Sequence, residues 1–438
     1  MSLMPSARVA APIATHIATD VATPGAASVP APACDAPSGL AATPAPLAHR
    51  LRTTLAAASI ALLAAGPALA QVGYTQIDVQ GMPVTIVYPT EVKAVPLRLG
   101  AFEIEVAIDA PLAPLAPMAA GAGERRPLVV TSHGTGGSPV PDHGLAAAFA
   151  RAGFVVAQPL HRGDNFRDAS QAGPEAWRTR PLDVLQVVDA LAAHPRWGAA
   201  LRFDRIGVHG TSAGGVTAMA LAGAQWRTLA LLQHCQAHPE EDLGFCFNGA
   251  ADAATQAKRR AAFERARGVP EVFLPAAVTA WQGGRTPPSA PASAANATVN
   301  ATVNATVNAT AAAFDARPDA RIAAVTLAVP VGVVFSAESL ARMQVPVGLV
   351  AAMADEMLLP RFHSSHIARH CRSCILLAEL PGATHFDVMQ PWPAEASQAA
   401  AAVHPRGAAV NPAFDARLRE QAYARVVQFH RRHLLAAD

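Results

Sequence analysis

Short apolar runs rich in β-branched residues alternate along the chain with longer segments whose apolar residues recur at helical spacing. The runs predict strands at residues 84–88, 102–107, 128–132, 154–158, 205–209, 322–329, 347–352 and 375–380. The longer segments predict helices at residues 144–152, 181–193, 214–222, 337–343, 361–370 and 414–434. Strands that alternate with helices form βαβ units, so the pattern predicts an α/β protein with a mostly parallel sheet and helices on both faces. The first two strands have no helix between them and are expected to form an antiparallel pair.

One long insert interrupts this alternation. Residues 224–320 contain Pro and Gly clusters, no clean strand, and a repeated Asn-Ala-Thr-Val unit that starts at Asn296. Thr and Val disfavour helix and nothing caps the repeat, so it is expected to be a disordered surface loop. The insert follows the predicted helix 214–222, and its position suggests a cap over one α/β domain that spans residues 71–438.

The N-terminal region divides into two parts. Residues 1–46 are rich in Pro, Ala, Ser and Thr and nearly uncharged, a composition that predicts disorder. A start codon placed too far upstream would account for this extension. Residues 47–70 resemble a secretory signal peptide, with basic residues, an apolar stretch and a small-x-small tripeptide in order: His49, Arg50, Arg52, residues 55–65, and Ala68-Leu69-Ala70.

The signal segment predicts cleavage after Ala70 and a mature protein in the periplasm or outside the cell. Its apolar stretch is shorter than the roughly 20 residues that a bilayer span needs, so no stable membrane anchor is expected.

Composition narrows the possible partners. The chain has 34 Lys and Arg against 32 Asp and Glu, a formal net charge of +2, and 51% hydrophobic residues. Such a balance gives no basic footprint for nucleic acid, whose binding depends on clustered Lys and Arg. The apolar fraction is sufficient for a sizeable core, so we expect an enzyme-sized globular domain that acts on a small molecule.

Four cysteines follow the signal segment, and an even number in an exported protein predicts disulfides. Three pairings are open; we favour Cys235 with Cys246 and Cys371 with Cys374, because each pair closes a short loop. The alternative is a zinc site, since Cys371 and Cys374 form a C-x-x-C. The spacing of Cys235 and Cys246 is not that of a zinc knuckle, so no metal is expected.

The clearest chemical motif is Gly210-Thr-Ser212-Ala-Gly214, a G-x-S-x-G. It follows the predicted strand 205–209 directly and opens the predicted helix at 214, which is the strand, sharp turn and helix of a nucleophile elbow. Glycine is needed on both sides because Cβ atoms there would collide as strand and helix pack. The motif therefore predicts Ser212 as a nucleophile, against the alternative of an ordinary glycine-rich turn.

An oxyanion hole needs backbone N–H donors near the nucleophile. In an elbow the next residue, here Ala213, supplies one, and the loop after an earlier strand supplies the other. The glycine-rich loop His133-Gly-Thr-Gly-Gly137 follows the strand 128–132. We expect Thr135 to be the second donor, with Gly134 as the alternative, and His133 to be structural.

The base and its orienting acid are expected in the order Ser, Asp or Glu, His. Asp355 lies just after the strand 347–352, and His385 lies on a glycine-containing loop after the strand 375–380. The sequence therefore predicts His385 as the general base and Asp355 as its partner, with Glu356 as the nearest rival.

Three further histidines share one predicted helix at helical spacing. A metal-binding face is one interpretation, but we expect exposed helix histidines without a ligand: His363, His366 and His370.

Together these motifs resemble a known family. The segments at residues 129–137, 153–165, 210–214, 354–355 and 382–386 are similar to bacterial α/β-hydrolases of the dienelactone hydrolase-like group, which are related to platelet-activating factor acetylhydrolase. The resemblance covers residues 73–435 except for the insert. It implies an α/β-hydrolase fold, a Ser-Asp-His site at Ser212, Asp355 and His385, and hydrolysis of short-chain esters. Dienelactone hydrolases themselves use a cysteine nucleophile, so a general carboxylic ester is the expected substrate.

The expected function is a secreted or periplasmic serine esterase without metal or organic cofactor. Two alternatives stay open. The same site could serve a lipase, a phospholipid acetylhydrolase or a polyesterase, and the fold could also persist as a binding protein without catalysis.

Overall fold

The computed structural model describes residues 70–115, 125–247, 254, 257, 261, 319–403 and 410–435. The extension 1–46, nearly all of the signal segment and the Asn-Ala-Thr-Val repeat lie outside the described residues. The described part of the insert is its beginning, residues 224–247, together with those three single residues and its last two, 319 and 320.

A single sheet runs through the described domain, in the order β10-β9-β8-β7-β5-β6-β2-β1-β4-β3. Its strands are β1 (Gln71–Val79), β2 (Met82–Thr90), β3 (Val95–Leu99), β4 (Phe102–Ile108), β5 (Arg126–Ser132), β6 (Val155–Pro159), β7 (Leu201–Thr211), β8 (Ile322–Ala328), β9 (Val347–Ala352) and β10 (Cys374–Leu380). From β10 to β6 each adjacent pair of strands is parallel, and β6 then pairs antiparallel with β2. The chain passes from β5 to β6 on one side and then to β7 on the other side of β5. The order of the strands therefore reverses at β5.

The antiparallel part of the sheet corrects one prediction. The opening antiparallel pair is β1 with β2, with Gln71 opposite Thr90, whereas the predicted partners β2 and β4 are separated by β1. The strand β1 was missed because Thr75, Gln76 and Asp78 interrupt its apolar residues. The short strand β3 was also missed and pairs with β4 as an edge hairpin.

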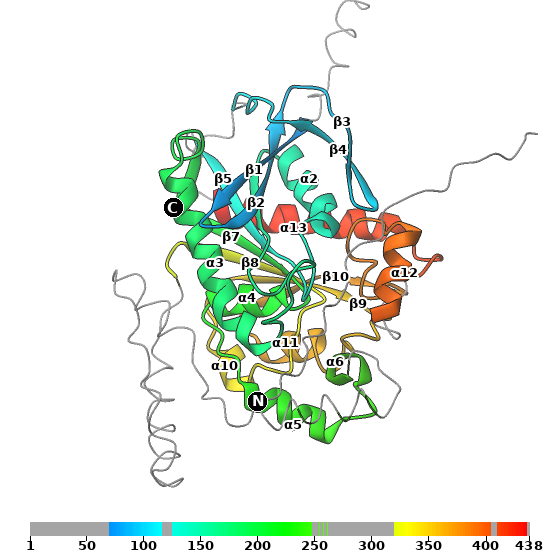
Figure 1. Cartoon of the computed structure of the whole chain (residues 1–438). Helices are drawn as coiled ribbons and strands as arrows, with labels where there is room; N and C mark the ends of the chain where they lie inside the picture. Colours follow the sequence, from blue (N-terminus) through cyan, green and yellow to red (C-terminus); the bar gives the residue numbers. More distant parts are fainter. Residues whose placement is uncertain are drawn as a thin grey trace, which may run out of the picture. The chain divides into compact units, whose positions relative to one another are not determined.

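Helices cover both faces of the sheet (Figure 1). The helical elements are η2 (Val140–Asp142), α2 (His143–Arg151), α3 (Pro174–Ala193), α4 (Gly214–Leu221), α5 (Thr228–Ala237), α6 (Leu243–Phe247), α10 (Ala337–Ala341), α11 (Ser364–His370), α12 (Ala394–Val403) and α13 (Ala416–Leu435). On one face α2 and α13 pack on the strands and on each other. On the other face α3, α4, α10 and α11 bury the larger hydrophobic cluster.

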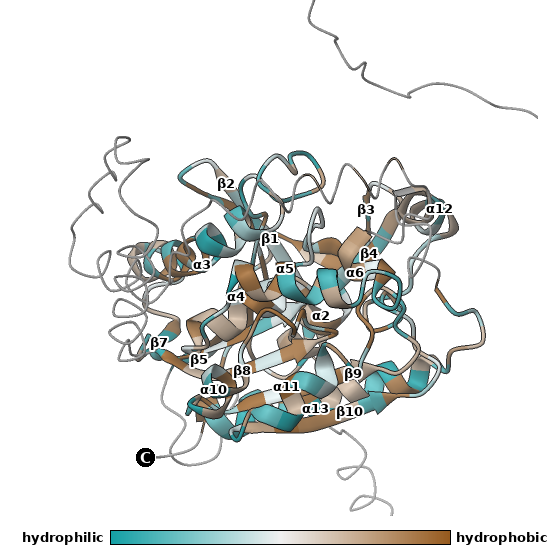
Figure 2. Ribbon diagram, turned by 90° about the horizontal axis from the view of Figure 1, so that it is seen from below, coloured by the Kyte–Doolittle hydropathy of each residue, from teal (hydrophilic) through white to brown (hydrophobic). Residues whose placement is uncertain are grey.

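The sequence of α13 shows how such a helix is held. Its buried residues include Ala422, Val426, Phe429 and Leu434, which recur at helical spacing, while the residues between them are mostly polar. Figure 2 shows this mixture of hydrophilic and hydrophobic residues along α13. The strands β5, β6 and β9 are buried along their whole length, as expected for strands covered on both faces.

Helix α3 begins earlier than predicted. The sequence suggested a start at Pro181, because proline lacks the N–H that a helix interior needs. The structure starts the helix at Pro174 and carries it through Pro181. Ala176, Trp177 and Arg180 are buried in this earlier part, and their packing outweighs the lost backbone bond.

The predicted fold class is confirmed. A mostly parallel sheet covered on both faces, an antiparallel strand pair at its start and a reversed strand order at β5 define an α/β-hydrolase fold. Loops at the carboxyl ends of β5, β7, β9 and β10 meet at one edge of the sheet, where such folds place their sites. Within the described ranges, no helix is long and apolar enough to cross a membrane.

Candidate active site

The turn between β7 and α4 holds Ser212 in a strained conformation. Its φ is 56°, a left-handed value that non-glycine residues adopt only when their surroundings enforce it. The N–H of Ser212 donates to Ala328 O at 2.9 Å, and its carbonyl accepts from Val331 N at 3.3 Å. The neighbouring strand β8 and the loop after it therefore fix the backbone on both sides of the serine.

The two glycines of the motif have no space for a side chain. A Cβ at Gly210 would overlap the carbonyl oxygen of Gly214, and a Cβ at Gly214 would overlap the carbonyl oxygen of Ser132. Strand, turn and helix therefore pack as closely as the G-x-S-x-G motif predicted. Ser212 itself stays partly exposed.

The structure pairs His385 with Asp355. His385 Nδ1 lies 2.8 Å from Asp355 Oδ2, and both side chains are almost fully buried. The other carboxylate oxygen, Oδ1, accepts the N–H groups of Met357 and Leu358 at 2.9 and 2.8 Å. Glu356 points to solvent and is exposed, so the rival carboxylate does not contact the histidine.

Because a carboxylate can only accept, the proton on His385 stands on Nδ1, and Nε2 is left as an acceptor. Within the described residues, hydrogen bonds link His385 to Asp355 but not to Ser212. Catalytic hydrogen bonds are often long before substrate binds, so the missing bond does not exclude a role for the two residues. Ser212 and His385 lie on loops that follow β7 and β10 at the same edge of the sheet.

The loop that carries His385 is held by a residue that the sequence analysis did not single out. Asp387 Oδ2 accepts from both the N–H and the hydroxyl of Thr384, each at 2.8 Å. Its carboxylate also accepts from the N–H of Asn411. One buried carboxylate thus ties Thr384, the residue before His385, to Asn411 of a distant segment. The sequence pattern Thr-His-Phe-Asp could have indicated this role of Asp387.

The glycine-rich loop lies beside the serine. A Cβ on Gly134 would stand 3.3 Å from Ser212 Cβ and 3.7 Å from its Oγ. The backbone N–H groups of Gly134, Thr135 and Ala213 donate to no acceptor in the part of the chain that the structure describes. The donors predicted for an oxyanion hole therefore have no competing acceptor among the described residues, and Gly134 remains beside Thr135 as a candidate.

His133 has a structural environment, as expected. Its Nδ1 donates to Gly134 O at 2.8 Å, and its Nε2 accepts from the N–H of His161 at 3.3 Å. Burial, together with the nearby Arg180 guanidinium and His161, lowers the pKa of His133 well below its ordinary value. A neutral imidazole with both nitrogens engaged is not a general base.

A second Ser-His-Asp chain lies inside the protein. Ser132 Oγ lies 2.9 Å from His161 Nε2, and His161 Nδ1 lies 3.1 Å from Asp183 Oδ2. Ser132 and His161 are fully buried, and Asp183 is 4% exposed. No substrate can reach this serine, so the chain of hydrogen bonds is a support for the end of β5. No motif in the sequence indicates it.

The helix histidines differ from the prediction. His363 is buried and not exposed: its Nε2 donates to Asp242 Oδ2 at 3.0 Å and its Nδ1 accepts from Gly332 N at 3.1 Å. His234 binds the same carboxylate oxygen at 2.7 Å. His366 is partly buried and contacts the carbonyl of Phe335. In the described ranges, no three His, Cys, Asp or Glu side chains form a group that could hold a metal ion.

The cysteines form the favoured pairs, Cys235 with Cys246 and Cys371 with Cys374. The first disulfide joins α5 to α6 at the beginning of the insert. Helix α6 lies directly against the loop that carries Asp355, here called the acid loop. The contact is so close that a Cβ at Gly244 would overlap the carbonyl oxygen of Glu356.

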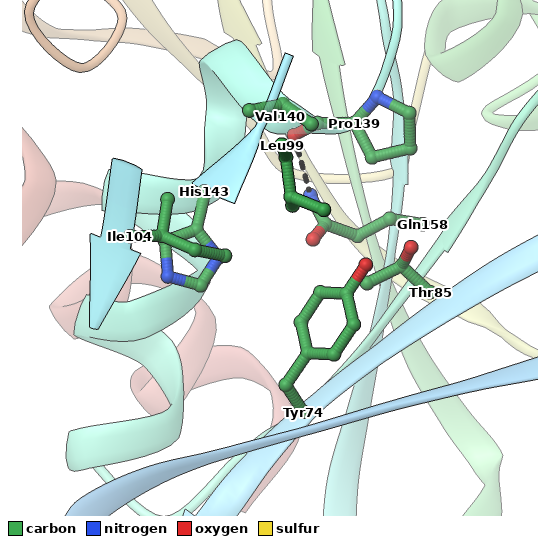
Figure 3. A pocket seen from close by; sticks show the side chains of 8 residues that line it. All are labelled: Tyr74, Thr85, Leu99, Ile104, Pro139, Val140, His143 and Gln158. Atoms are coloured by element: carbon green, nitrogen blue, oxygen red, sulfur yellow. Dashed lines mark hydrogen bonds between the residues drawn. The ribbon is translucent and has the colours of Figure 1, made fainter. Parts of the chain in front are cut away.

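Two small cavities lie within the described domain. One lies between β1, β2, the β3–β4 hairpin and η2, where the side chains of Tyr74, His143 and Gln158 converge (Figure 3). None of its lining residues belongs to the loops around Ser212. The other lies beneath the serine turn and is lined by Thr211, the residue before Ser212, and by the buried Asp142.

Asp142 accepts from the Thr211 hydroxyl at 2.9 Å. Burial raises the pKa of Asp142 to about 7, and the hydrogen bond from Thr211 offsets only part of this effect. A carboxyl group with a raised pKa therefore contacts Thr211, the residue before Ser212.

No protein-family model and no curated protein matches the chain. Among solved structures, a ferulic acid esterase from Streptomyces cinnamoneus is similar to it, with a TM-score of 0.47 and 14% identity over 85% of this chain and 92% of that chain. The fold class stated above rests on the sheet order of this chain, and the site rests on the geometry around Ser212.

Proposed function

We propose that the protein is a serine hydrolase that cleaves carboxylic esters with short acyl groups. The observation that carries this proposal is the strained Ser212 at the carboxyl edge of the sheet, with a buried Asp355–His385 pair on loops at the same edge. Strain of this kind persists where the surrounding structure enforces it, and it is concentrated at functional turns.

In the proposed reaction, Ser212 Oγ attacks the ester carbonyl carbon and its proton passes to Nε2 of His385. Asp355 holds the Nδ1 proton and stabilises the imidazolium. The negative carbonyl oxygen accepts hydrogen bonds from the N–H of Ala213 and that of Thr135 or Gly134. His385 then protonates the leaving alcohol, and a water molecule cleaves the acyl-enzyme by the same steps.

Apolar surface near the mouth of the site supports an acyl substrate. Phe166 is 61% exposed, and its N–H donates to Gly137 O at 3.0 Å, beside the glycine-rich loop. Met353 is 44% exposed and lies two residues before Asp355. Because the exposed apolar surface in the described ranges consists of few side chains, short acyl groups fit the proposal better than the long chains of a lipase.

The test is hydrolysis of p-nitrophenyl esters with acyl chains of graded length. Turnover that is highest for acetate or propionate supports the short-chain esterase, and a maximum at long chains points to the lipase alternative. No turnover of any ester by the folded protein supports a binding protein and rejects the proposed function.

We also propose that the mature protein is exported, with cleavage after Ala70. The two disulfides support this, because such bonds persist in oxidising compartments. N-terminal sequencing of the exported protein should give Gln71 as the first residue; a chain that stays in the cytoplasm with an intact N-terminus would contradict the proposal.

A further inference from the structure

A fully buried ion pair lies behind the glycine-rich loop. Arg180 comes from α3 and Asp164 from the loop after β6, and neither side chain is exposed. Arg180 Nη2 lies 2.8 Å from Asp164 Oδ2. Burying two charges costs free energy that a single ion pair often does not recover, so such a pair commonly serves a purpose other than stability.

The guanidinium holds two consecutive backbone carbonyls. Its Nη1 donates to His133 O at 2.6 Å, and its Nη2 donates to Gly134 O at 3.2 Å and to Asp164 O at 3.0 Å. The partner carboxylate continues the contact, because Asp164 Oδ1 accepts the N–H of Gly136 at 2.7 Å. The ion pair therefore contacts three successive peptide groups of the loop, those between residues 133 and 134, 134 and 135, and 135 and 136.

These contacts decide where the N–H groups of the loop point. A peptide unit is planar and trans, so its C=O and its N–H point in opposite directions. The carbonyl of His133 shares a peptide unit with the N–H of Gly134, and the carbonyl of Gly134 shares one with the N–H of Thr135. Because Arg180 draws both carbonyls toward the interior, both N–H groups are turned away from it.

Ser212 lies against the same loop. The Cβ position of Gly134 lies within 4 Å of Ser212 Cβ and Oγ, and neither N–H has an acceptor among the described residues. Gly134 O is the more firmly held carbonyl, since it also accepts from His133 Nδ1 and from Gly137 N. The orientation of the Thr135 N–H is therefore the better fixed of the two.

We propose that Arg180 is a positioning residue of the oxyanion hole, which it aligns by holding the carbonyls of His133 and Gly134. This role rests on the proposed ester hydrolysis. Arg180 does not touch the substrate. It presents the loop N–H groups to the oxyanion before the reaction begins, so that no reorganisation is needed as negative charge develops.

Helix α3 supports the same loop at a second point, one turn later. Asp183 binds His161, which accepts from the hydroxyl of Ser132 at the start of the loop. The end of β5 and the loop are thus held at residues 132, 133, 134 and 136 by side chains of one buried cluster.

The test compares Arg180→Lys with a matched variant on the same helix, Arg178→Lys. Arg178 forms an ion pair with Glu175 at the protein surface. A lysine at position 180 keeps the charge beside Asp164 but lacks the planar fork that binds two carbonyls at once. Each protein is assayed for kcat and KM on p-nitrophenyl acetate, for the rate of inactivation by a fluorophosphonate, and for its melting temperature.

We expect Arg180→Lys to lower kcat about 10- to 100-fold, below the loss of a whole oxyanion donor, with KM changed less than about threefold. The inactivation rate should fall in parallel, because phosphonylation also places negative charge in the oxyanion hole. Arg178→Lys should stay within about twofold of the wild type in every measurement. The double variant Arg180→Met with Asp164→Asn removes both charges and should show the same loss of kcat while folded.

A folded Arg180→Lys with wild-type kcat and inactivation rate would overturn the positioning role. Failure of both Arg180 variants to fold, or losses of activity that only follow the unfolded fraction, would assign the ion pair to stability instead. If the wild type neither hydrolyses the ester nor reacts with the fluorophosphonate, the proposed function fails, and this inference fails with it.

Discussion

His385 Nδ1 lies 2.8 Å from Asp355 Oδ2, and the second carboxylate oxygen of Asp355 is held by two backbone N–H groups of its own loop. The carboxylate is therefore fixed from one side and orients the imidazole on the other. This leaves Nε2 as the only ring atom of His385 that can take a proton.

Asp355→Asn should lower kcat by roughly ten-thousand-fold, because an amide at this position favours the wrong imidazole tautomer. The matched control is Glu356→Gln, the adjacent exposed carboxylate, which should retain kcat within about threefold. Steady-state kinetics on p-nitrophenyl acetate give both values. The opposite ranking of the two variants would show that Glu356 is the orienting acid.

Asp142 should make stability depend on pH. Burial raises its pKa in the folded protein to about 7, above the ordinary value of 3.8, so between these values the folded protein holds a proton that the unfolded chain has lost. The contribution of Asp142 is thus fully present below about pH 4 and is lost as the pH rises through about 7. Asp142→Asn stays neutral and can still accept from Thr211.

We therefore expect Asp142→Asn to unfold with a free energy about 2 to 4 kcal/mol higher than the wild type at pH 8.5 and nearly equal at pH 4. Urea denaturation at the two pH values measures the difference. A variant that is less stable than the wild type at pH 8.5 would mean that Asp142 is ionised without penalty in the fold.

The two disulfides should differ in their effects. By the loop-closure relation, removing the Cys235–Cys246 bond, with a separation of 11 residues, should cost about 3 kcal/mol, and removing the Cys371–Cys374 bond, with a separation of 3, about 2 kcal/mol. Only the first bond joins the helices that pack behind the acid loop, so only its double serine variant should also lower kcat.

Urea denaturation and kinetics of the two double variants test this expectation. The exported wild type should also be about four hydrogens lighter before reduction than after it. Free thiols in the exported protein, or a kcat loss confined to the Cys371–Cys374 variant, would contradict it.

Phe166→Ala should raise KM more for butyrate esters than for acetate, because the exposed ring offers apolar surface to the longer chain. The kcat for acetate should change little. Val92→Ala is the control: this exposed residue follows β2, which runs antiparallel to β6, so it lies toward the opposite edge of the sheet. Equal KM values for Phe166→Ala and the wild type across acyl lengths would place the acyl site elsewhere.

Features with a local signature could be predicted from the sequence. Strand β9 has the predicted bounds, because it is a short apolar run between polar turns. The pairing of Asp355 with His385 follows from chain order, since each residue comes just after a neighbouring parallel strand. The glycines at 210 and 214 likewise reflect a local packing rule.

Features that depend on distant contacts could not be predicted. Arg180 and the carbonyl of His133 are 47 residues apart, and only the fold brings them together. His363 looked like an exposed helix residue because its partner Asp242 lies in the insert, 121 residues away. The sequence analysis did not predict helices α5 and α6 for a related reason. A disulfide joins them and α6 packs on the acid loop, and these contacts rather than a strong apolar period hold them in place.

The most direct test of the central claim is to locate the residue that a fluorophosphonate modifies. Ser132 lies in the buried Ser-His-Asp chain and Ser212 on the turn after β7, so peptide mass mapping should distinguish the two serines. We predict one adduct per chain, on the peptide that contains Ser212, and its complete loss in Ser212→Ala, whereas Ser132→Ala still reacts at Ser212. No adduct on the folded protein, or an adduct on Ser132, would contradict the proposal that Ser212 is the nucleophile.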